Sequence, residues 1–160
     1  MVRMKKGKKK LCFVSSSGGH WEELMCLREI ADENDSFFVT EEGGQVQDAA
    51  LKGTFYTIPQ INRREKGFAF KFIKLFFKAF SILRKEKPDV VITTGALAAF
   101  PFCLAGKIMR KKIVYIETFA RVNGKSLTGK LVYPFADLFL VQWEPMLKCY
   151  PKAKYVGGIF

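Results

Sequence analysis

The chain has 160 residues, 49% of them hydrophobic, which excludes global disorder and allows a well-packed core. Its 27 basic and 15 acidic residues give a net charge of +12, which favours anionic partners such as phosphorylated substrates, anionic lipids or nucleic acid. No two of its four cysteines have C-x-x-C spacing, and no apolar run approaches the ~20 residues of a membrane-spanning helix, so we expect no metal, no cofactor and no transmembrane segment.

Short apolar runs alternate with helical patterns along the chain. We expect strands at residues 11–14, 36–40, 55–58, 90–93, 112–116, 138–141 and 154–156. We expect helices at residues 20–31, 68–87, 97–107 and 126–135, with a short helical piece at 145–149. Because each strand is a continuous apolar run, this order indicates an α/β fold, a Rossmann-like parallel sheet with helices on both faces. The domain would cover residues 11–156, between a basic N-terminal tail at 1–10 and a short C-terminal tail at 157–160.

The first predicted strand is followed by a turn of small residues and by His20, the only histidine of the chain. Backbone N–H groups at a helix N-terminus have no partner in the helix, and small side chains let a phosphate approach them closely. We therefore expect a phosphate or diphosphate to contact the turn residues Ser16, Ser17, Gly18 and Gly19. The alternative is that these residues only form a tight connection between the strand and the helix and bind no ligand. His20 is a candidate general base.

Ligands of parallel sheets bind beyond the carboxyl ends of the strands, where three further loops carry polar or aromatic residues. Thr94 and Gly95 follow the fourth strand in a second turn of small residues. Glu117 and Arg121 follow the fifth strand. They form either a structural ion pair or a site in which the carboxylate holds a sugar hydroxyl or orients the histidine. Trp143, after the sixth strand, is either a core residue or part of a partner interface.

The predicted helix at residues 68–87 is amphipathic and rich in phenylalanine. One face carries Lys71, Lys74 and Lys78. The opposite, apolar surface includes Phe72, Phe76, Phe77 and Phe80. Either this surface packs on the core and the lysines are solvated, or the helix lies in a membrane interface with its lysines among anionic headgroups. The further apolar residues Phe70 and Leu75 widen the apolar surface and favour the membrane interpretation.

The C-terminal tail consists of Gly157, Gly158, Ile159 and Phe160. A soluble chain gains nothing from exposing Ile and Phe at its end. These residues therefore either fold back onto the domain or dock on a second protein.

Five segments occur together along the chain: FVSSSGGH (13–20), VITTGA (91–96), ETFARV (117–122), SLTGK (126–130) and ADLFLVQW (136–143). On these segments the chain resembles the asparagine-linked-glycosylation protein fourteen family. It is more closely similar to the bacterial capsule and exopolysaccharide members of that family, the PssD-like glycosyltransferase subunits. The resemblance covers nearly the whole chain from Lys10 onward, and it is the combination of segments that makes it specific.

The resemblance implies half of an enzyme, the N-terminal, acceptor-binding domain of a GT-B glycosyltransferase. A small catalytic subunit would supply the C-terminal domain and most of the UDP-sugar site, so this chain would be inactive or weakly active alone. The pair would add a sugar to a lipid-diphosphate-linked saccharide at the cytoplasmic face of the cell membrane. The donor sugar stays open among galactose, glucose, glucuronate and N-acetylglucosamine.

Site residues follow from the same resemblance. It implies that the turn at residues 17–20 faces the acceptor diphosphate, with the turn at 94–96 beside it, and that Glu117 and Arg121 lie at the cleft. Eukaryotic members begin with a membrane-spanning anchor where this chain has its basic tail, so the helix at 68–87 is the expected replacement. Trp143 and residues 157–160 are the expected docking site for the catalytic subunit.

Two other classes of function compete with this interpretation. A non-catalytic scaffold would only recruit the catalytic subunit to the membrane and activate it. A nucleic-acid-binding protein would explain the net charge of +12, but the sequence contains no helix-turn-helix, zinc or RNP pattern. We therefore expect no nucleic-acid partner.

Overall fold

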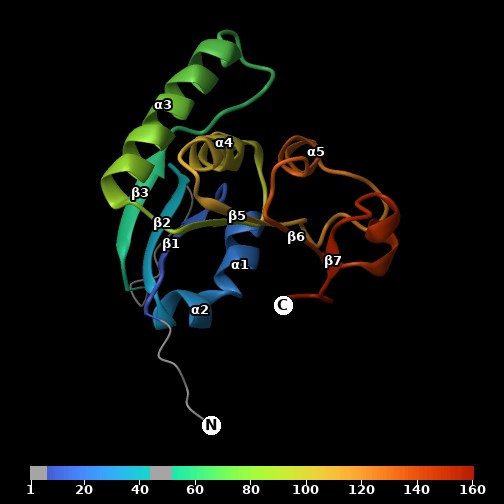
Figure 1. The fold of residues 1–160 in the computed structure, drawn as a ribbon. Helices are drawn as coiled ribbons and strands as arrows, with labels where there is room; N and C mark the ends of the chain where they lie inside the picture. The colour runs from blue at the N-terminus through green and yellow to red at the C-terminus, as the bar shows by residue number, and fades with distance from the viewer. Residues whose placement is uncertain (1–6, 44–51) are drawn as a thin grey trace.

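The computed structural model describes residues 7–43 and 52–160, so residues 1–6 of the predicted N-terminal tail lie outside it. Within the described residues, seven parallel strands form one sheet in the order β3-β2-β1-β4-β5-β6-β7 (Figure 1). The strands are β1 (Lys10–Val14), β2 (Asp35–Glu41), β3 (Thr54–Ile58), β4 (Val90–Thr93), β5 (Lys112–Ile116), β6 (Leu138–Val141) and β7 (Lys154–Tyr155). The predicted Rossmann-like parallel sheet is confirmed.

Helices lie on both faces of the sheet. The α-helices are α1 (Gly19–Met25), α2 (Arg28–Glu33), α3 (Phe68–Glu86), α4 (Phe100–Ile108) and α5 (Leu127–Val132). Two 3-10 turns, η1 (Leu97–Ala99) and η2 (Glu144–Lys148), complete the described elements. Helices α3, α4 and α5 cover one face, and α1 and α2 lie against the other (Figure 1).

The alternation of side chains along β1 builds a core on each side of the sheet. Cys12 and Val14 belong to the larger apolar cluster, which includes buried residues of α3 and α4. Phe13 belongs to the second cluster, together with Trp21 and Leu24 of α1. Because β1 is buried on both faces, its sequence is a continuous apolar run rather than an alternating one.

The order of the strands reverses at β1. Cys12 pairs with Phe37 of β2 on one side and with Val91 of β4 on the other. The chain therefore proceeds outward from β1 to β3 and then crosses back to β4. In open parallel sheets such a reversal leaves a crevice beyond the carboxyl ends of the two central strands, which is where ligands bind.

Two predicted helices differ from the structure. The helix expected at residues 20–31 is divided into α1 and α2 at Leu27, whose ψ of 15° interrupts it; Leu24 and Ala31 both lie in the second core cluster. The helix expected at 126–135 ends at Val132, two residues before Pro134, although Tyr133 keeps a helical backbone conformation. Its start is as expected, since the Ser126 hydroxyl accepts a hydrogen bond from the Gly129 N–H.

Candidate functional site

The turn between β1 and α1 exposes its backbone at the carboxyl edge of the sheet. Gly18 has a φ of +78°, a backbone conformation that residues other than glycine rarely adopt. A Cβ atom added at Gly18 or Gly19 would meet no other atom within 4 Å, so open space lies beside both residues. In the first turn of α1 the N–H groups of Trp21 and Glu22 donate to the Gly18 carbonyl oxygen, and those of Gly19 and His20 precede the first hydrogen bond of the helix. That an anion binds at this turn stays a prediction.

His20 and Thr94 connect this turn to the one after β4 through two hydrogen bonds. His20 Nδ1 lies 3.1 Å from the Thr94 carbonyl oxygen, and Thr94 Oγ1 donates to the His20 carbonyl oxygen at 2.8 Å. Because a carbonyl oxygen only accepts, Nδ1 carries the proton. This contact selects the tautomer of the neutral ring whose Nε2 can accept a proton, as a general base must.

The turn after β4 lies against His20 and holds it. The Gly95 N–H donates to Thr93 Oγ1 at 3.0 Å, and the Thr94 hydroxyl donates to the His20 carbonyl oxygen. A Cβ atom at Gly95 would lie 3.0 Å from the Tyr115 hydroxyl and 3.5 Å from His20 Cε1, so the backbone passes very close to the ring. That Thr94 and Gly95 also bind the diphosphate stays a prediction.

A cavity of about 180 Å³ lies beside His20. Two arginines contribute to its lining, Arg63 from the loop before α3 and Arg121 from the loop after β5. The remaining lining residues are Ala96, Leu97, Tyr115, Thr118, Ser126, Leu127 and Thr128. Two guanidinium groups near a histidine suit a doubly charged phosphate ligand, because the planar fork of arginine donates two parallel hydrogen bonds. The structure thus brings His20 and Arg121 together, as expected, and adds Arg63.

Glu41, at the end of β2, is an acidic neighbour of the turn that the sequence analysis did not single out. Its side chain is buried, and burial raises the pKa of the carboxyl above its usual value. Hydrogen bonds from the backbone of Ile61 and Ser17 oppose part of that rise. The predicted contact between the Ser17 backbone and a phosphate therefore competes with Glu41. Ser16, like Ser17, is half-buried.

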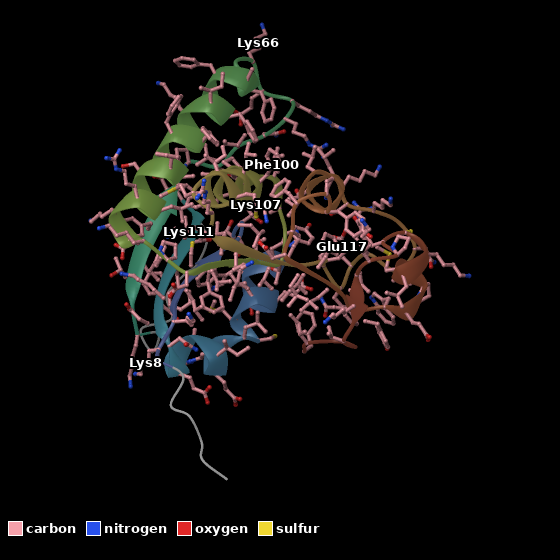
Figure 2. All side chains as sticks on the ribbon, in the orientation of Figure 1. Lys8, Lys66, Phe100, Lys107, Lys111 and Glu117 are labelled. Carbon is pink, nitrogen blue, oxygen red and sulfur yellow. The ribbon has the colours of Figure 1, made fainter. Side chains whose placement is uncertain are left out.

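Glu117 lies inside the fold, where its label in Figure 2 marks it at the end of β5. Its side chain is 1% exposed. Oε2 accepts hydrogen bonds from the Tyr150 hydroxyl at 2.8 Å and from the Ser126 hydroxyl at 3.0 Å, and Oε1 accepts from the Thr118 N–H at 3.2 Å. Burial, followed by the bond to Glu117, raises the pKa of Tyr150 far above its usual range.

In this structure the Glu117 carboxylate is occupied by the N-terminal end of α5 and by Tyr150. Its contacts are hydrogen bonds to hydroxyl and backbone groups, and they include neither His20 nor Arg121. These hydrogen bonds fix the loop that carries Arg121. That Glu117 is catalytic stays a prediction.

A second buried carboxylate fixes the other side of this loop. Glu23 of α1 accepts a hydrogen bond from the Phe119 N–H at 2.7 Å and another from the Gln142 side-chain amide. Gln142 also donates to the Glu117 carbonyl oxygen at 3.1 Å and accepts from the Ile159 N–H at 3.0 Å. The network joins α1, the β5–α5 loop, the end of β6 and the C-terminal tail.

The C-terminal tail lies along the β5–α5 loop and leaves its last side chain in solvent. Trp143 Nε1 donates to the Phe119 carbonyl oxygen at 2.7 Å, and the two rings lie 4.7 Å apart between centroids. Phe160 packs edge-on against Phe119 at 5.5 Å, yet it stays 71% exposed. The predicted docking residues Trp143 and 157–160 thus form one aromatic surface with Phe119, which we call the tail surface.

The exposed apolar surface of α3 differs from the one predicted. Phe72, Phe76 and Phe80 are half-buried: Phe76 and Phe80 pack on the core and Phe72 stacks on Phe100, which does not favour the expectation that they enter lipid. Phe77 is exposed as expected, at 66%, and it lies beside the exposed Phe70 and Ile73. We call these three residues the α3 apolar face. The predicted lysines Lys71, Lys74 and Lys78 are all exposed.

Two searches of the described part of the chain gave negative results. Among residues 7–43 and 52–160, no helix combines the length and hydropathy that crossing a membrane requires. In the same residues, no group of three His, Cys, Asp or Glu side chains is arranged to hold a metal ion.

Comparison with known proteins gives a consistent set of relatives. The sequence model of the family described as "Oligosaccharide biosynthesis protein Alg14 like" matches residues 11–159. The UDP-N-acetylglucosamine transferase subunit ALG14 of Yarrowia lipolytica is 28% identical over 181 residues, covering 98% of this chain and 84% of that protein. The subunit of the same name from Homo sapiens is 26% identical, covering 91% of this chain and 81% of that protein.

Solved structures show the same fold at low sequence identity. MurG of Acinetobacter baumannii superimposes with a TM-score of 0.76 and 17% identity, covering 93% of this chain. A UDP-N-acetylglucosamine 2-epimerase superimposes with a TM-score of 0.73 and 16% identity, covering 91% of this chain. The chain spans only 45% of each of these two solved chains, so it corresponds to about half of such a protein.

Proposed function

Because the chain belongs to the Alg14-like family of oligosaccharide biosynthesis proteins, we propose that it is the acceptor-binding subunit of a two-component glycosyltransferase. In this proposal a second, catalytic subunit supplies the other half of a GT-B enzyme and most of the UDP-sugar site. The names of the relatives support it, since each is called a subunit of a UDP-N-acetylglucosamine transferase. So does the extent of the chain, which spans 45% of the solved MurG chain.

The acceptor in this proposal is a saccharide linked to a lipid through a diphosphate. The observation that carries it is the pairing of His20 with Thr94, which leaves Nε2 free at the β1–β4 crevice. There the open turn at Gly18 and Gly19 offers backbone donors, and Arg63 and Arg121 offer positive charge. A diphosphate held by these groups would bring an acceptor hydroxyl to His20, which would remove its proton as the sugar is transferred.

Two surfaces provide the remaining requirements of such a subunit. The tail surface offers exposed aromatic side chains, which are enriched at protein interfaces, to the catalytic subunit. The α3 apolar face, flanked by lysines, suits a membrane interface rich in anionic lipid. The resemblance to PssD-like proteins suggests capsule or exopolysaccharide synthesis as the setting. The same resemblance implies that the subunit acts at the cytoplasmic face of the membrane.

The proposal is tested by reconstitution with a candidate catalytic subunit that consists of a GT-B C-terminal domain. Labelled sugar from a UDP-sugar should enter a lipid-diphosphate acceptor only when both subunits and vesicles are present. Transfer by the partner alone at the full rate would contradict a role in acceptor binding. Full transfer after loss of His20 would favour the rival function, a scaffold that only recruits the catalytic subunit.

A further inference from the structure

Three hollows follow one another from His20 to the surface of α3. The cavity beside His20 shares Arg63 and Leu97 with a second hollow of about 320 Å³. That hollow shares Ile61 with a third one of about 250 Å³, which lies between the β3–α3 loop and α3. The three hollows thus lie next to one another along one path of lining residues. It begins at two arginines and a histidine and ends against a helix that carries exposed phenylalanines.

The third hollow is a groove with an apolar floor and lysine walls. Pro59, Ile61 and Leu75 contribute the apolar side chains. Lys71, Lys74 and Lys78 complete its lining. Long basic side chains of this kind cover apolar surface with their hydrocarbon stems while their charged ends stay in water.

Contacts at both ends of the groove hold its walls in place. Lys78 Nζ donates to the Thr57 carbonyl oxygen at 2.7 Å and so ties α3 to the end of β3. Lys71 forms an ion pair with Glu65, which ties the first turn of α3 to the loop before it. Between them, Lys74 Nζ lies 4.5 Å from the centre of the Phe70 ring. The groove is therefore a formed feature of the fold with positive charge at its rim.

We propose that this groove holds the first part of the apolar chain of the acceptor lipid while its diphosphate lies in the cavity beside His20. The inference rests on the proposed function and adds to it a binding site for the hydrocarbon chain. Such a ligand has an anionic head and an apolar tail. The path matches this order, because Arg63 and Arg121 lie at one end and an apolar floor lies at the other.

The position of the groove explains how a membrane lipid reaches a site at the sheet edge. The α3 apolar face of Phe70, Ile73 and Phe77 lies on the same helix and points into solvent. Lys66 projects from the tip of the loop just before this helix (Figure 2). With that face in the bilayer interface, the acceptor would leave the lipid along α3 and pass over Ile61 to the arginines.

The test measures how tightly the purified chain binds isoprenoid diphosphates of increasing length by isothermal titration calorimetry, below their micelle concentrations. Isopentenyl, geranyl and geranylgeranyl diphosphate are the probes. We expect geranylgeranyl diphosphate to bind at least about tenfold more tightly than isopentenyl diphosphate, because additional buried methylene groups strengthen binding. Ile61→Ser and the groove-filling Ile61→Trp should each remove this length dependence while leaving the binding of isopentenyl diphosphate unchanged.

A matched control and three contrary outcomes make the test decisive. Phe77→Ser removes an apolar side chain of α3 outside the groove and should keep the full length dependence. Equal affinity at all lengths in the wild-type chain, or full length dependence in both Ile61 variants, would overturn the groove and leave the proposed function standing. Failure of every diphosphate to bind would contradict both. Equally tight, Ile61-dependent binding of dihexanoyl phosphatidylglycerol would assign the groove to ordinary phospholipid and overturn the proposal.

Discussion

His20 and Thr94 are joined by two hydrogen bonds. His20 Nδ1 lies 3.1 Å from the Thr94 carbonyl oxygen, and the Thr94 hydroxyl lies 2.8 Å from the His20 carbonyl oxygen. The two residues are 74 positions apart in the sequence and belong to turns that follow adjacent strands. Their pairing determines both the direction of the imidazole ring and the nitrogen that carries its proton. The proposed chemistry depends on this pairing more than on any other contact of the site.

Replacing Thr94 with valine should slow transfer by about fivefold, because the loss of one hydrogen bond, about 1 kcal/mol, loosens the position of the histidine. Thr94→Ser keeps the hydroxyl and should retain nearly full activity. The comparison is made by measuring kcat of the reconstituted pair. Equal rates for the two variants would show that the hydroxyl does not position His20.

Replacing Glu117 with alanine should destabilise the fold rather than act on the chemistry alone. The change leaves the Tyr150 and Ser126 hydroxyls without their acceptor inside the protein and should lower the free energy of unfolding by about 3 kcal/mol. Chemical denaturation of the isolated chain measures this loss. Glu144→Ala, at an exposed position, is the control and should change the free energy of unfolding by less than about 0.5 kcal/mol. An unchanged stability of Glu117→Ala together with lost transfer would support a catalytic role for this residue.

Changing Phe70, Ile73 and Phe77 to serine should abolish flotation of the chain with vesicles that contain anionic lipid. All three side chains are more than half exposed, so the fold should tolerate the changes. The same number of changes at Phe72, Phe76 and Phe80 should instead lower the thermal midpoint, because Phe76 and Phe80 pack on the core and Phe72 stacks on Phe100. Wild-type flotation of the first variant would exclude the α3 apolar face as the membrane contact.

Removing Ile159 and Phe160 should prevent co-purification with the catalytic subunit. The deletion loses one hydrogen bond to Gln142 and an exposed ring, so the free energy of unfolding should fall by no more than about 1 kcal/mol. Phe160→Ala removes the ring that contacts Phe119 but keeps the hydrogen bond from the Ile159 N–H to Gln142. It therefore distinguishes the aromatic contact from the backbone contact. An intact complex after the deletion would remove the tail surface from the interface.

The stability of the isolated chain should fall as the pH rises through the raised pKa of Glu41. Its folded-state pKa lies above its usual value because of burial, so the protonated form is favoured in the folded protein and that contribution is lost at higher pH. Glu41→Gln cannot ionise and should lack this part of the pH dependence. Urea denaturation of both proteins between pH 4 and pH 8 measures the difference. If the free energy of unfolding changes with pH equally in both proteins, burial does not disfavour the ionised form of Glu41.

The order of apolar runs was enough to predict a parallel sheet and to place His20 at its carboxyl edge, because both follow from local pattern. Arg63 and Glu41 were missed, since they reach the turn only through the pairing of β2 with its neighbours. The position of Glu41 at the end of a predicted strand was a usable signal, as the carboxyl ends of parallel strands share one edge.

A different cause explains why the contacts of Glu117 and the core-facing side of α3 were not predicted. The sequence places an acid after a strand, but it does not show that Tyr150, 33 residues later, will cover it. On α3 the apolar residues extend around most of the helix, so the pattern alone does not decide which arc faces the core. Packing against α4, where Phe72 stacks on Phe100 at 6.0 Å, determines that orientation.

The most direct measurement is kcat for sugar transfer by the reconstituted pair with His20→Asn. An asparagine amide can still donate to the Thr94 carbonyl oxygen, but it provides no basic nitrogen in place of Nε2. We predict a fall in kcat of at least about 100-fold, with unchanged partner binding and an unchanged thermal midpoint. A kcat within twofold of the wild-type value would contradict the assignment of His20 as the base and leave the chain as a subunit that only binds and recruits.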